Sequence, residues 1–197
     1  MKKIIGIIMI LIGILLIITT TFIQYTVHKN QQVMIDEFKS TIKDIDKEDN
    51  QKYSNLKSSE SGKKEDEKGV IGTINIPKIE LKAAISEGVE IETLKYAVGH
   101  FRGTPLPEEK GNFCLAGHRS YTYGEFFNRL DELEIGDVII VETQTGTYKY
   151  SVYEKKIVEP NEISVVDNSK SSTITLVTCT PIRIATHRLI IKGKLRE

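Results

Sequence analysis

The amino-acid sequence predicts a mostly β protein: a closed, largely antiparallel barrel of seven or eight short strands with one or two short helices, preceded by an N-terminal transmembrane helix. Residues 4–23 form an unbroken apolar run, and short β-rich runs alternate with turn-forming residues from residue 69 onward. Many short strands separated by turns are typical of antiparallel barrels. We expect a cytoplasmic stub with a membrane anchor over residues 1–25, a juxtamembrane helix and flexible linker over 26–68, and a β-barrel domain over 69–197.

The apolar run at residues 4–23 contains no charge and no proline. Its length matches the roughly 20 residues that a helix needs to cross a bilayer. Lys2 and Lys3 precede it, so the positive-inside rule predicts a cytoplasmic N-terminus and an extracytoplasmic remainder. A cleaved signal peptide is the alternative. The run is longer than the roughly 7–15 residues of a signal core, and no small-x-small cleavage site follows it, which favours an uncleaved anchor.

The segment after the anchor is polar and charge-mixed. Residues 31–47 show partial helical spacing, which predicts a juxtamembrane helix. The residues that carry this spacing are Val33, Phe38, Ile42 and Ile45. From residue 48 to 68 the composition predicts a flexible tether without a core of its own.

The barrel domain contains seven recognisable β-rich runs. They lie at residues 70–76, 81–85, 112–118, 138–142, 147–153, 173–179 and 187–194. Between them, residues 125–133 place Phe126, Leu130 and Leu133 at helical spacing, which predicts a short helix. The sequence stops soon after the last run, so we expect no second membrane span. Lys and Arg (27) balance Asp and Glu (27), which gives no electrostatic case for nucleic-acid binding.

The segment TITLVTCTPIRIATHRLIIKGKL, residues 173–195, indicates a reactive site. Cys179 ends one β-rich run, and Arg188 begins the next after a short loop that contains proline. Such runs are expected to pair as antiparallel strands, with opposed side chains roughly 4.5–5.5 Å apart. A neighbouring cation lowers the pKa of a thiol, and a guanidinium can stabilise an oxyanion. Cys179 is therefore a candidate nucleophile, and Arg188 is a candidate for oxyanion stabilisation.

A thiol that carries out acyl transfer needs a proton-transfer partner, and the chain offers four histidines. His118 follows a β-rich run in the phrase LAGHRSY, where small residues allow close approach, and we predict that it is the general acid and base. His100 is the second candidate. His28 lies beside the membrane, and His187 points to the face opposite Arg188 on a strand.

Two segments resemble the sortase family of Gram-positive cell-surface transpeptidases: LAGHRSYTYGEFFNRLDELEIGDVIIV, and TLVTCTP followed by THRL. The resemblance covers roughly residues 70–195. It implies an eight-stranded β-barrel in which His118 is the catalytic histidine, Cys179 the nucleophile and Arg188 the catalytic arginine. It also implies cleavage of a Leu-Pro-x-Thr-Gly-like sorting signal after Thr through a thioester, followed by transfer to a cell-wall amine.

The phrases CTP and THRL resemble classes C and D of the family. Class C members usually carry an Asp-Pro-aromatic lid and a C-terminal anchor, and the sequence shows neither, so we expect class D. The implied partners are secreted proteins that carry the signal, a lipid-linked peptidoglycan precursor that supplies the amine, and the membrane, through residues 4–23. We expect no nucleic acid, metal or other cofactor, and an extracellular catalytic domain on a single-pass anchor in the cell membrane.

Several further residues carry weaker expectations. Cys114 could pair with Cys179 in an oxidising compartment, but a buried free thiol is the favoured interpretation. Ala116 is expected to line the substrate groove, whereas Thr178 and Thr180 shape either the oxyanion pocket or only the packing of a strand edge. The rival functions are a class C-like pilin-polymerising sortase, a secreted cysteine endopeptidase that only hydrolyses, and a membrane-tethered binding barrel without catalysis.

Overall fold

The computed structural model describes residues 2–52, 69–119 and 126–196. Eight strands form a closed barrel, which confirms the predicted fold class. The strands are β1 (Val70–Ile76), β2 (Leu81–Glu87), β3 (Val98–His100), β4 (Asn112–Ala116), β5 (Val138–Glu142), β6 (Thr147–Val158), β7 (Thr173–Thr180) and β8 (His187–Leu195). The helices are α1 (Lys2–Lys52) and α2 (Ile91–Leu94), with 3-10 turns η1 (Pro77–Ile79), η2 (Leu130–Glu132) and η3 (Ile163–Val166).

The strands follow one another around the barrel in the order β1-β2-β3-β4-β7-β8-β6-β5. The β2–β3 and β4–β7 pairs are parallel, and the other pairs are antiparallel. A parallel pair needs a crossover connection, and the chain between β4 and β7 supplies one that contains β5 and β6. This crossover brings β4 directly beside β7, so that β4, β7 and β8 are consecutive strands.

The interior of the barrel is filled by alternate side chains of these strands. Ile174 and Leu176 of β7, with Leu189 and Ile191 of β8, belong to the core and are at most 2% exposed. Because successive side chains of a strand point to opposite faces, the residues between them point away from this core. This alternation decides which face of the barrel carries the candidate catalytic residues.

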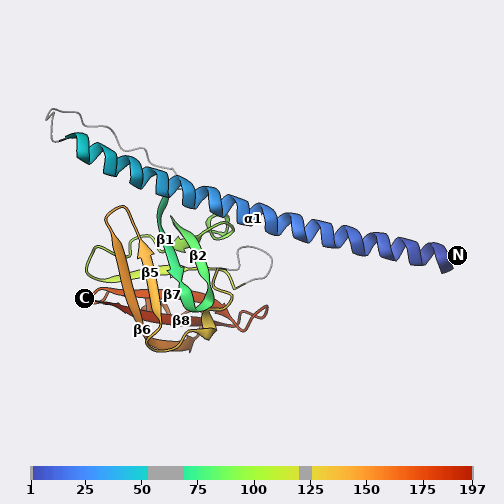
Figure 1. Ribbon diagram of the computed structural model, residues 1–197. Coiled ribbons are helices and arrows are strands. Elements are labelled where there is room, and N and C mark those ends of the chain that lie inside the picture. Colours follow the sequence, from blue (N-terminus) through green and yellow to red (C-terminus); the bar gives the residue numbers. More distant parts are fainter. Residues whose placement is uncertain (1, 53–68, 120–125, 197) are drawn as a thin grey trace.

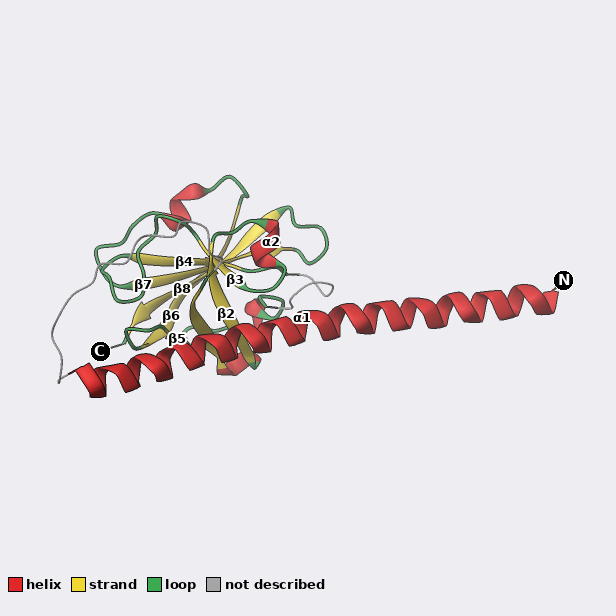
Figure 2. Ribbon diagram, turned by 90° about the horizontal axis from the view of Figure 1, so that it is seen from above, coloured by secondary structure: helices red, strands yellow, loops and turns green. Residues whose placement is uncertain are grey.

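Helix α1 is one continuous helix that runs along the barrel beside β1 and β2 (Figures 1 and 2). Its segment Ile4–Ser40 is long and apolar enough to cross a membrane. Beyond residue 23, a stripe of α1 faces the barrel and packs through Ile35 on Ala84 and Ala97. The buried members of this stripe are Val27, Gln31, Ile35 and Phe38.

The structure corrects the sequence prediction for α1 in two respects. Val33 was expected on the apolar face of the juxtamembrane helix, but it is 47% exposed, because the buried stripe runs through Ile35 instead. Residues 48–52, expected to belong to a flexible tether, continue α1. The remainder of that predicted tether, residues 53–68, lies outside the described residues.

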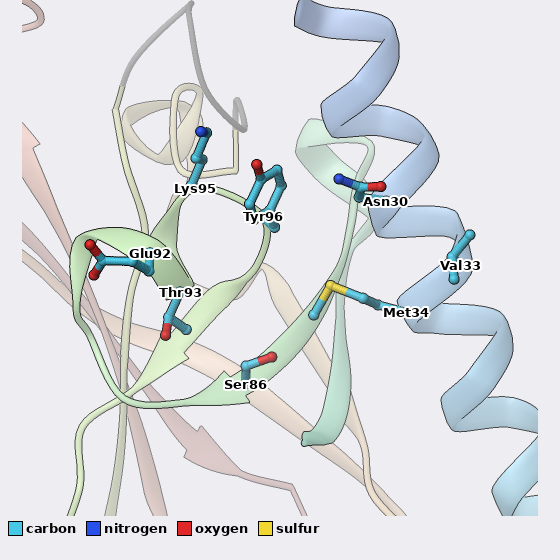
Figure 3. Close-up of a pocket in the computed structure, with 8 residues that line it drawn as sticks. All are labelled: Asn30, Val33, Met34, Ser86, Glu92, Thr93, Lys95 and Tyr96. Carbon is cyan, nitrogen blue, oxygen red and sulfur yellow. The ribbon is translucent and has the colours of Figure 1, made fainter. Parts of the chain in front are cut away.

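A cavity of about 610 Å³ opens between α1, β2 and the α2 region (Figure 3). Its lining residues are Asn30, Val33, Met34, Ser86, Glu92, Thr93, Lys95 and Tyr96. None of the predicted catalytic residues lines it. Strands β1 and β2, which carry α1, are separated from β7 by β3 and β4 on one side and by β5, β6 and β8 on the other. Helix α1 and this cavity therefore lie apart from the strands that carry Cys179 and Arg188.

The predicted helix over residues 125–133 is absent from the described part of that segment. Residues 126–129 form turns that lead into η2, although Phe126, Leu130 and Leu133 are buried as expected. Phe127 is fully buried as well, so two consecutive side chains face the core. A short segment gains little from helical hydrogen bonds alone, so here the burial of apolar side chains determines the backbone path.

Candidate active site

Cys179 and Arg188 are directly opposed residues of β7 and β8. The antiparallel register continues one residue further, to the pair Thr180 and His187. Side chains of β7 at even positions, such as Leu176, point into the core, so Cys179 points outward. On β8 the core residue Leu189 points inward, so the preceding Arg188 points outward. Cys179 and Arg188 therefore share the outer face of the barrel, in the relation expected from the sequence.

His118 follows β4, the strand that lies on the other side of β7 from β8. The parallel register of β4 with β7 ends at the pair Ala116 and Val177. It is extended by the backbone N–H of Gly117, which donates to the carbonyl oxygen of Val177 at 3.2 Å, and by Thr178 Oγ1, which donates to the carbonyl oxygen of Gly117 at 2.8 Å. Continued by one residue, the register places His118 level with Cys179. The three predicted catalytic residues thus occupy one level of three consecutive strands or their extensions.

The guanidinium of Arg188 is held by the loop that precedes it. Its Nη1 donates to the carbonyl oxygens of Ala185 at 3.1 Å and His187 at 2.9 Å. Ala185 has a left-handed backbone (φ 59°), and its N–H is bonded to the carbonyl oxygen of Pro181. Among the described residues, Nη1 is the only nitrogen of this guanidinium with a hydrogen-bond partner. Nε and Nη2 are not bonded to any residue that the structure describes.

His118 is half-buried, and its backbone carbonyl oxygen accepts a hydrogen bond from the N–H of Phe127 at 3.2 Å. Burial lowers the pKa of His118 from its ordinary value of 6.5, because the charged imidazolium loses hydration. The neutral imidazole is therefore favoured in the fold. A neutral imidazole beside a thiol can accept the thiol proton and later return it to a leaving amine.

His100 and His187 have other partners. His100 is buried, with Nδ1 2.7 Å from Glu87 Oε2 and Nε2 2.8 Å from Thr104 Oγ1. Both of its ring nitrogens are engaged inside the fold, which explains it as a structural residue. His187 makes a surface contact, with Nε2 3.2 Å from Glu159 Oε1.

The two cysteines are unpaired and have different environments. Cys114 is fully buried, and its Sγ donates to the carbonyl oxygen of Asn112 at 3.3 Å. Burial raises the pKa of Cys114 to about 12, because the thiolate would lose its hydration there. Cys179 is only half-buried, so it is the thiol accessible for chemistry.

The structure gives the positions of Ala116, Thr178 and Thr180, for which the sequence carried weaker expectations. Ala116 is half-buried on the outer face of β4, beside Val177. Thr178 is 2% exposed, and its hydroxyl is used to fasten Gly117. Thr180 is 8% exposed, and its hydroxyl accepts a hydrogen bond from Arg119. Both threonine hydroxyls thus hold neighbouring segments together, whereas Ala116 is half-buried on the same face of the barrel as Cys179.

Arg119 was not singled out from the sequence. Its side chain is only 6% exposed, and Nη2 lies 2.7 Å from Asp131 Oδ1. An arginine in a polar phrase predicts a surface residue, so the sequence carries no local signal of this burial. Only its place directly after His118 could have drawn attention to it.

Comparisons with known proteins identify the family of this barrel. Residues 74–196 match the Sortase domain family. Sortase SrtE1 of Streptomyces coelicolor is 37% identical over 143 residues, which cover 63% of this chain and 40% of that protein. Sortase A of Listeria monocytogenes is 30% identical over 207 residues, which cover the whole chain and 92% of that protein.

A solved structure of a Clostridium perfringens Sortase D5 transpeptidase superposes with a TM-score of 0.69 and 30% identity, over 86% of this chain and 99% of that chain. Similar proteins named Sortase A, Sortase D and Sortase C1 also occur, so the comparisons identify the family rather than one class. The chain spans less than two thirds of SrtE1 but nearly all of the Listeria protein and the solved D5 structure. The closed barrel, the register around Cys179 and these matches lead to one conclusion: the chain belongs to the sortase family, whose members are cysteine transpeptidases.

Proposed function

We propose that this chain is a membrane-anchored cysteine transpeptidase that cleaves a Leu-Pro-x-Thr-Gly-like sorting signal after Thr and transfers the released protein to a cell-wall amine. One observation carries the proposal: the β7–β8 register opposes Cys179 to Arg188, and the β4–β7 register, continued by two residues beyond its last pair, puts His118 level with Cys179. A half-buried thiol between an imidazole and a guanidinium has the three groups that acyl transfer requires.

In the first step, the Cys179 sulfur attacks the carbonyl carbon of the signal's Thr, and His118 takes the thiol proton. The carbonyl oxygen becomes an oxyanion, which Nε and Nη2 of Arg188 stabilise. When the intermediate collapses, the Thr–Gly bond breaks and His118 donates its proton to the departing amine. The products are a thioester on Cys179 and a free peptide that begins with Gly.

In the second step, an amine of a lipid-linked peptidoglycan precursor attacks the thioester carbon. His118 takes the proton of the attacking amine, Arg188 again stabilises the oxyanion, and the thiol leaves with the proton. A new amide bond replaces the thioester. Water in place of the amine would give hydrolysis, so the acceptor decides between a transpeptidase and an endopeptidase.

We further propose the class D group and an extracellular barrel. No proline precedes Pro77 in the chain, so the Asp-Pro-aromatic lid motif of class C is absent from the sequence before the barrel. We assign residues 1–25 to a cytoplasmic stub and anchor, 26–68 to a juxtamembrane segment and 69–197 to the catalytic barrel. The apolar length of α1 and the two lysines at its start support this topology. Secreted proteins that carry the sorting signal and the membrane-bound amine precursor would then meet the barrel at the same membrane.

The test uses the full chain in detergent micelles and quenched peptides that contain Leu-Pro-x-Thr-Gly or Leu-Pro-x-Thr-Ala, with and without peptide amines. Cys179→Ala is the inactive variant, and Cys114→Ala is the matched control because Cys114 is the buried thiol. We expect cleavage after Thr and an amide-exchanged product, lost in Cys179→Ala and retained in Cys114→Ala. Cleavage that never yields the exchanged product would support the endopeptidase instead, and equal activity of Cys179→Ala would contradict the proposed chemistry.

A further inference from the structure

We infer that Arg119 is a positioning residue that holds His118 in register with Cys179. The inference rests on the proposed function and deepens it, because it adds a residue to the control of proton transfer. His118 needs such support because the β4 ladder ends at Ala116, two residues before it. Cys179 and Arg188, by contrast, are held by the continuous β7–β8 ladder.

Three nitrogens of the Arg119 guanidinium bind three different groups. Nη2 lies 2.7 Å from Asp131 Oδ1, Nη1 donates to Thr180 Oγ1 at 2.7 Å, and Nε donates to the carbonyl oxygen of Asn128 at 3.3 Å. The guanidinium is planar and its donors are fixed in direction, so three bonds determine both its place and its orientation.

These partners lie on the elements that surround the catalytic pair. Thr180 directly follows Cys179 on β7, and Arg119 directly follows His118. Asn128 and Asp131 belong to the segment whose Phe127 N–H binds the carbonyl oxygen of His118. One side chain therefore joins the residue after the nucleophile, the residue after the general acid and the segment that holds the general acid.

Burial makes this link different from a surface ion pair. The Arg119 side chain is 6% exposed, and a buried cation without partners is strongly destabilising. Once Asp131 compensates the charge, the remaining two bonds serve orientation. Lysine would keep the charge beside Asp131 but cannot present three donors in one plane. Arg119→Lys therefore separates loss of geometry from loss of charge.

The decisive readout is the pH profile of Cys179 alkylation by iodoacetamide, measured on the full chain in detergent in a Cys114→Ala background. His118→Ala defines the profile of a thiol without its imidazole. We expect Arg119→Lys and Thr180→Val to shift the profile toward that of His118→Ala. We also expect both variants to lower kcat, by about tenfold for Arg119→Lys, and to leave KM within about twofold of the wild type. Small misplacements of reacting groups slow the chemical step more than they weaken binding.

Arg129→Ala is the matched control. Arg129 lies in the same segment and its side chain is 47% exposed. Its partners among the described residues are Ile79, Glu80 and Glu132, which lie outside β4 and β7. We expect wild-type alkylation and kcat from this variant. Thermal unfolding of every variant confirms that it is folded, and Thr180→Val, which removes only a hydroxyl, decides the question if Arg119→Lys does not fold.

Wild-type alkylation profiles and kcat in both Arg119→Lys and Thr180→Val would overturn the inference. An alkylation profile of His118→Ala identical to that of the wild type would overturn it too, since no imidazole would then be coupled to the thiol. Failure of the proposed function looks different: the wild type would cleave no sorting peptide, while the alkylation profiles would still report the link between Arg119, His118 and Cys179.

Discussion

Gly117 directly follows β4 and packs against the ring of Phe127. The variant Gly117→Ala tests whether this contact determines the position of the neighbouring His118. An added Cβ would lie 2.7 Å from Cδ2 and 2.8 Å from Cγ of Phe127. Gly117 is not one of the residues with positive φ, so alanine meets a steric obstacle and not backbone strain. Phe127 is fully buried in a close-packed core, so its ring has no free space to move into. Overpacking of this kind costs about 1–3 kcal/mol, and we expect a loss of this size in the free energy of unfolding.

The same substitution should slow catalysis. The backbone N–H of Phe127 binds the carbonyl oxygen of His118, so a displaced Phe127 or a displaced Gly117 moves the imidazole relative to Cys179. A displacement of about 1 Å can lower a rate by about 100-fold. We expect kcat for peptide cleavage to fall by roughly 10- to 100-fold in Gly117→Ala, with KM within about twofold. The double variant Gly117→Ala with Phe127→Leu should recover part of both losses, because the smaller side chain relieves the overlap.

Gly193→Ala is the matched control for this experiment. Its Cβ would lie 2.9 Å from Ile174 Cγ2 and 3.1 Å from Tyr150 Cβ, a similar overlap in the core of β8. Gly193 follows Arg188 by five residues on one strand, or about 17 Å at 3.4 Å per residue. Urea unfolding should therefore show a similar loss of stability, whereas kcat stays within about twofold of the wild type. Wild-type stability and kcat in Gly117→Ala would refute the reasoning, as would an equal fall of kcat in Gly193→Ala.

Three further predictions concern the catalytic groups. Arg188→Ala should keep the fold and lower kcat by about 10²–10³-fold, the effect of losing an oxyanion donor. Arg188→Lys should restore little of this activity, because an ammonium group cannot present the same donors. Near wild-type turnover in a folded Arg188→Ala would contradict the assignment. Iodoacetamide should modify one thiol of the native chain, Cys179, since burial raises the pKa of Cys114 to about 12; mass spectrometry of Cys179→Ala should show no modification until the chain is unfolded. Burial lowers the pKa of His118 below its ordinary 6.5, so the unfolded chain binds this proton more readily, and the free energy of unfolding should rise with pH in the window just below 6.5. His118→Gln should remove this rise in urea titrations, and an unchanged slope would contradict the burial argument.

The sequence predicted the structure well where residue types and their order within one short segment determine it. Seven of the eight strands follow from β-rich runs, and the opposition of Cys179 and Arg188 follows from the short loop that joins their strands. Strand β3 has only three residues, Val98–His100, too few to show a period. It is held by parallel pairing with β2 and antiparallel pairing with β4, which local sequence cannot reveal.

Long-range contacts account for the remaining differences. Gln31 is buried on α1 because the helix lies against the barrel, whereas its polar side chain predicts exposure. The Arg119 side chain is buried where it binds Thr180 and Asp131. Thr180 lies on β7, far from Arg119 in the chain, and Asp131 lies in the separate turn η2. The predicted helix over 125–133 was wrong because Phe127 also needs burial. In each case the deciding partner lies on another element, which periodicity does not record.

Cys179 and Arg188 are held by a continuous strand ladder, whereas His118 lies beyond the end of its strand. This difference predicts which catalytic step is most sensitive to substitution. The backbone ladder that opposes Cys179 to Arg188 cannot be altered without disturbing the pairing of β7 with β8. His118 stands beyond the last ladder pair of β4. Its carbonyl oxygen is bonded by the Phe127 N–H, the preceding Gly117 is bonded by the Thr178 hydroxyl, and by our inference Arg119 adds a third support. The Thr178 hydroxyl and the Arg119 guanidinium belong to side chains, so we expect substitutions to remove them while the barrel stays closed. Substitutions around His118 should therefore slow proton transfer in folded protein, whereas substitutions that disturb the β7–β8 pairing should reduce stability first.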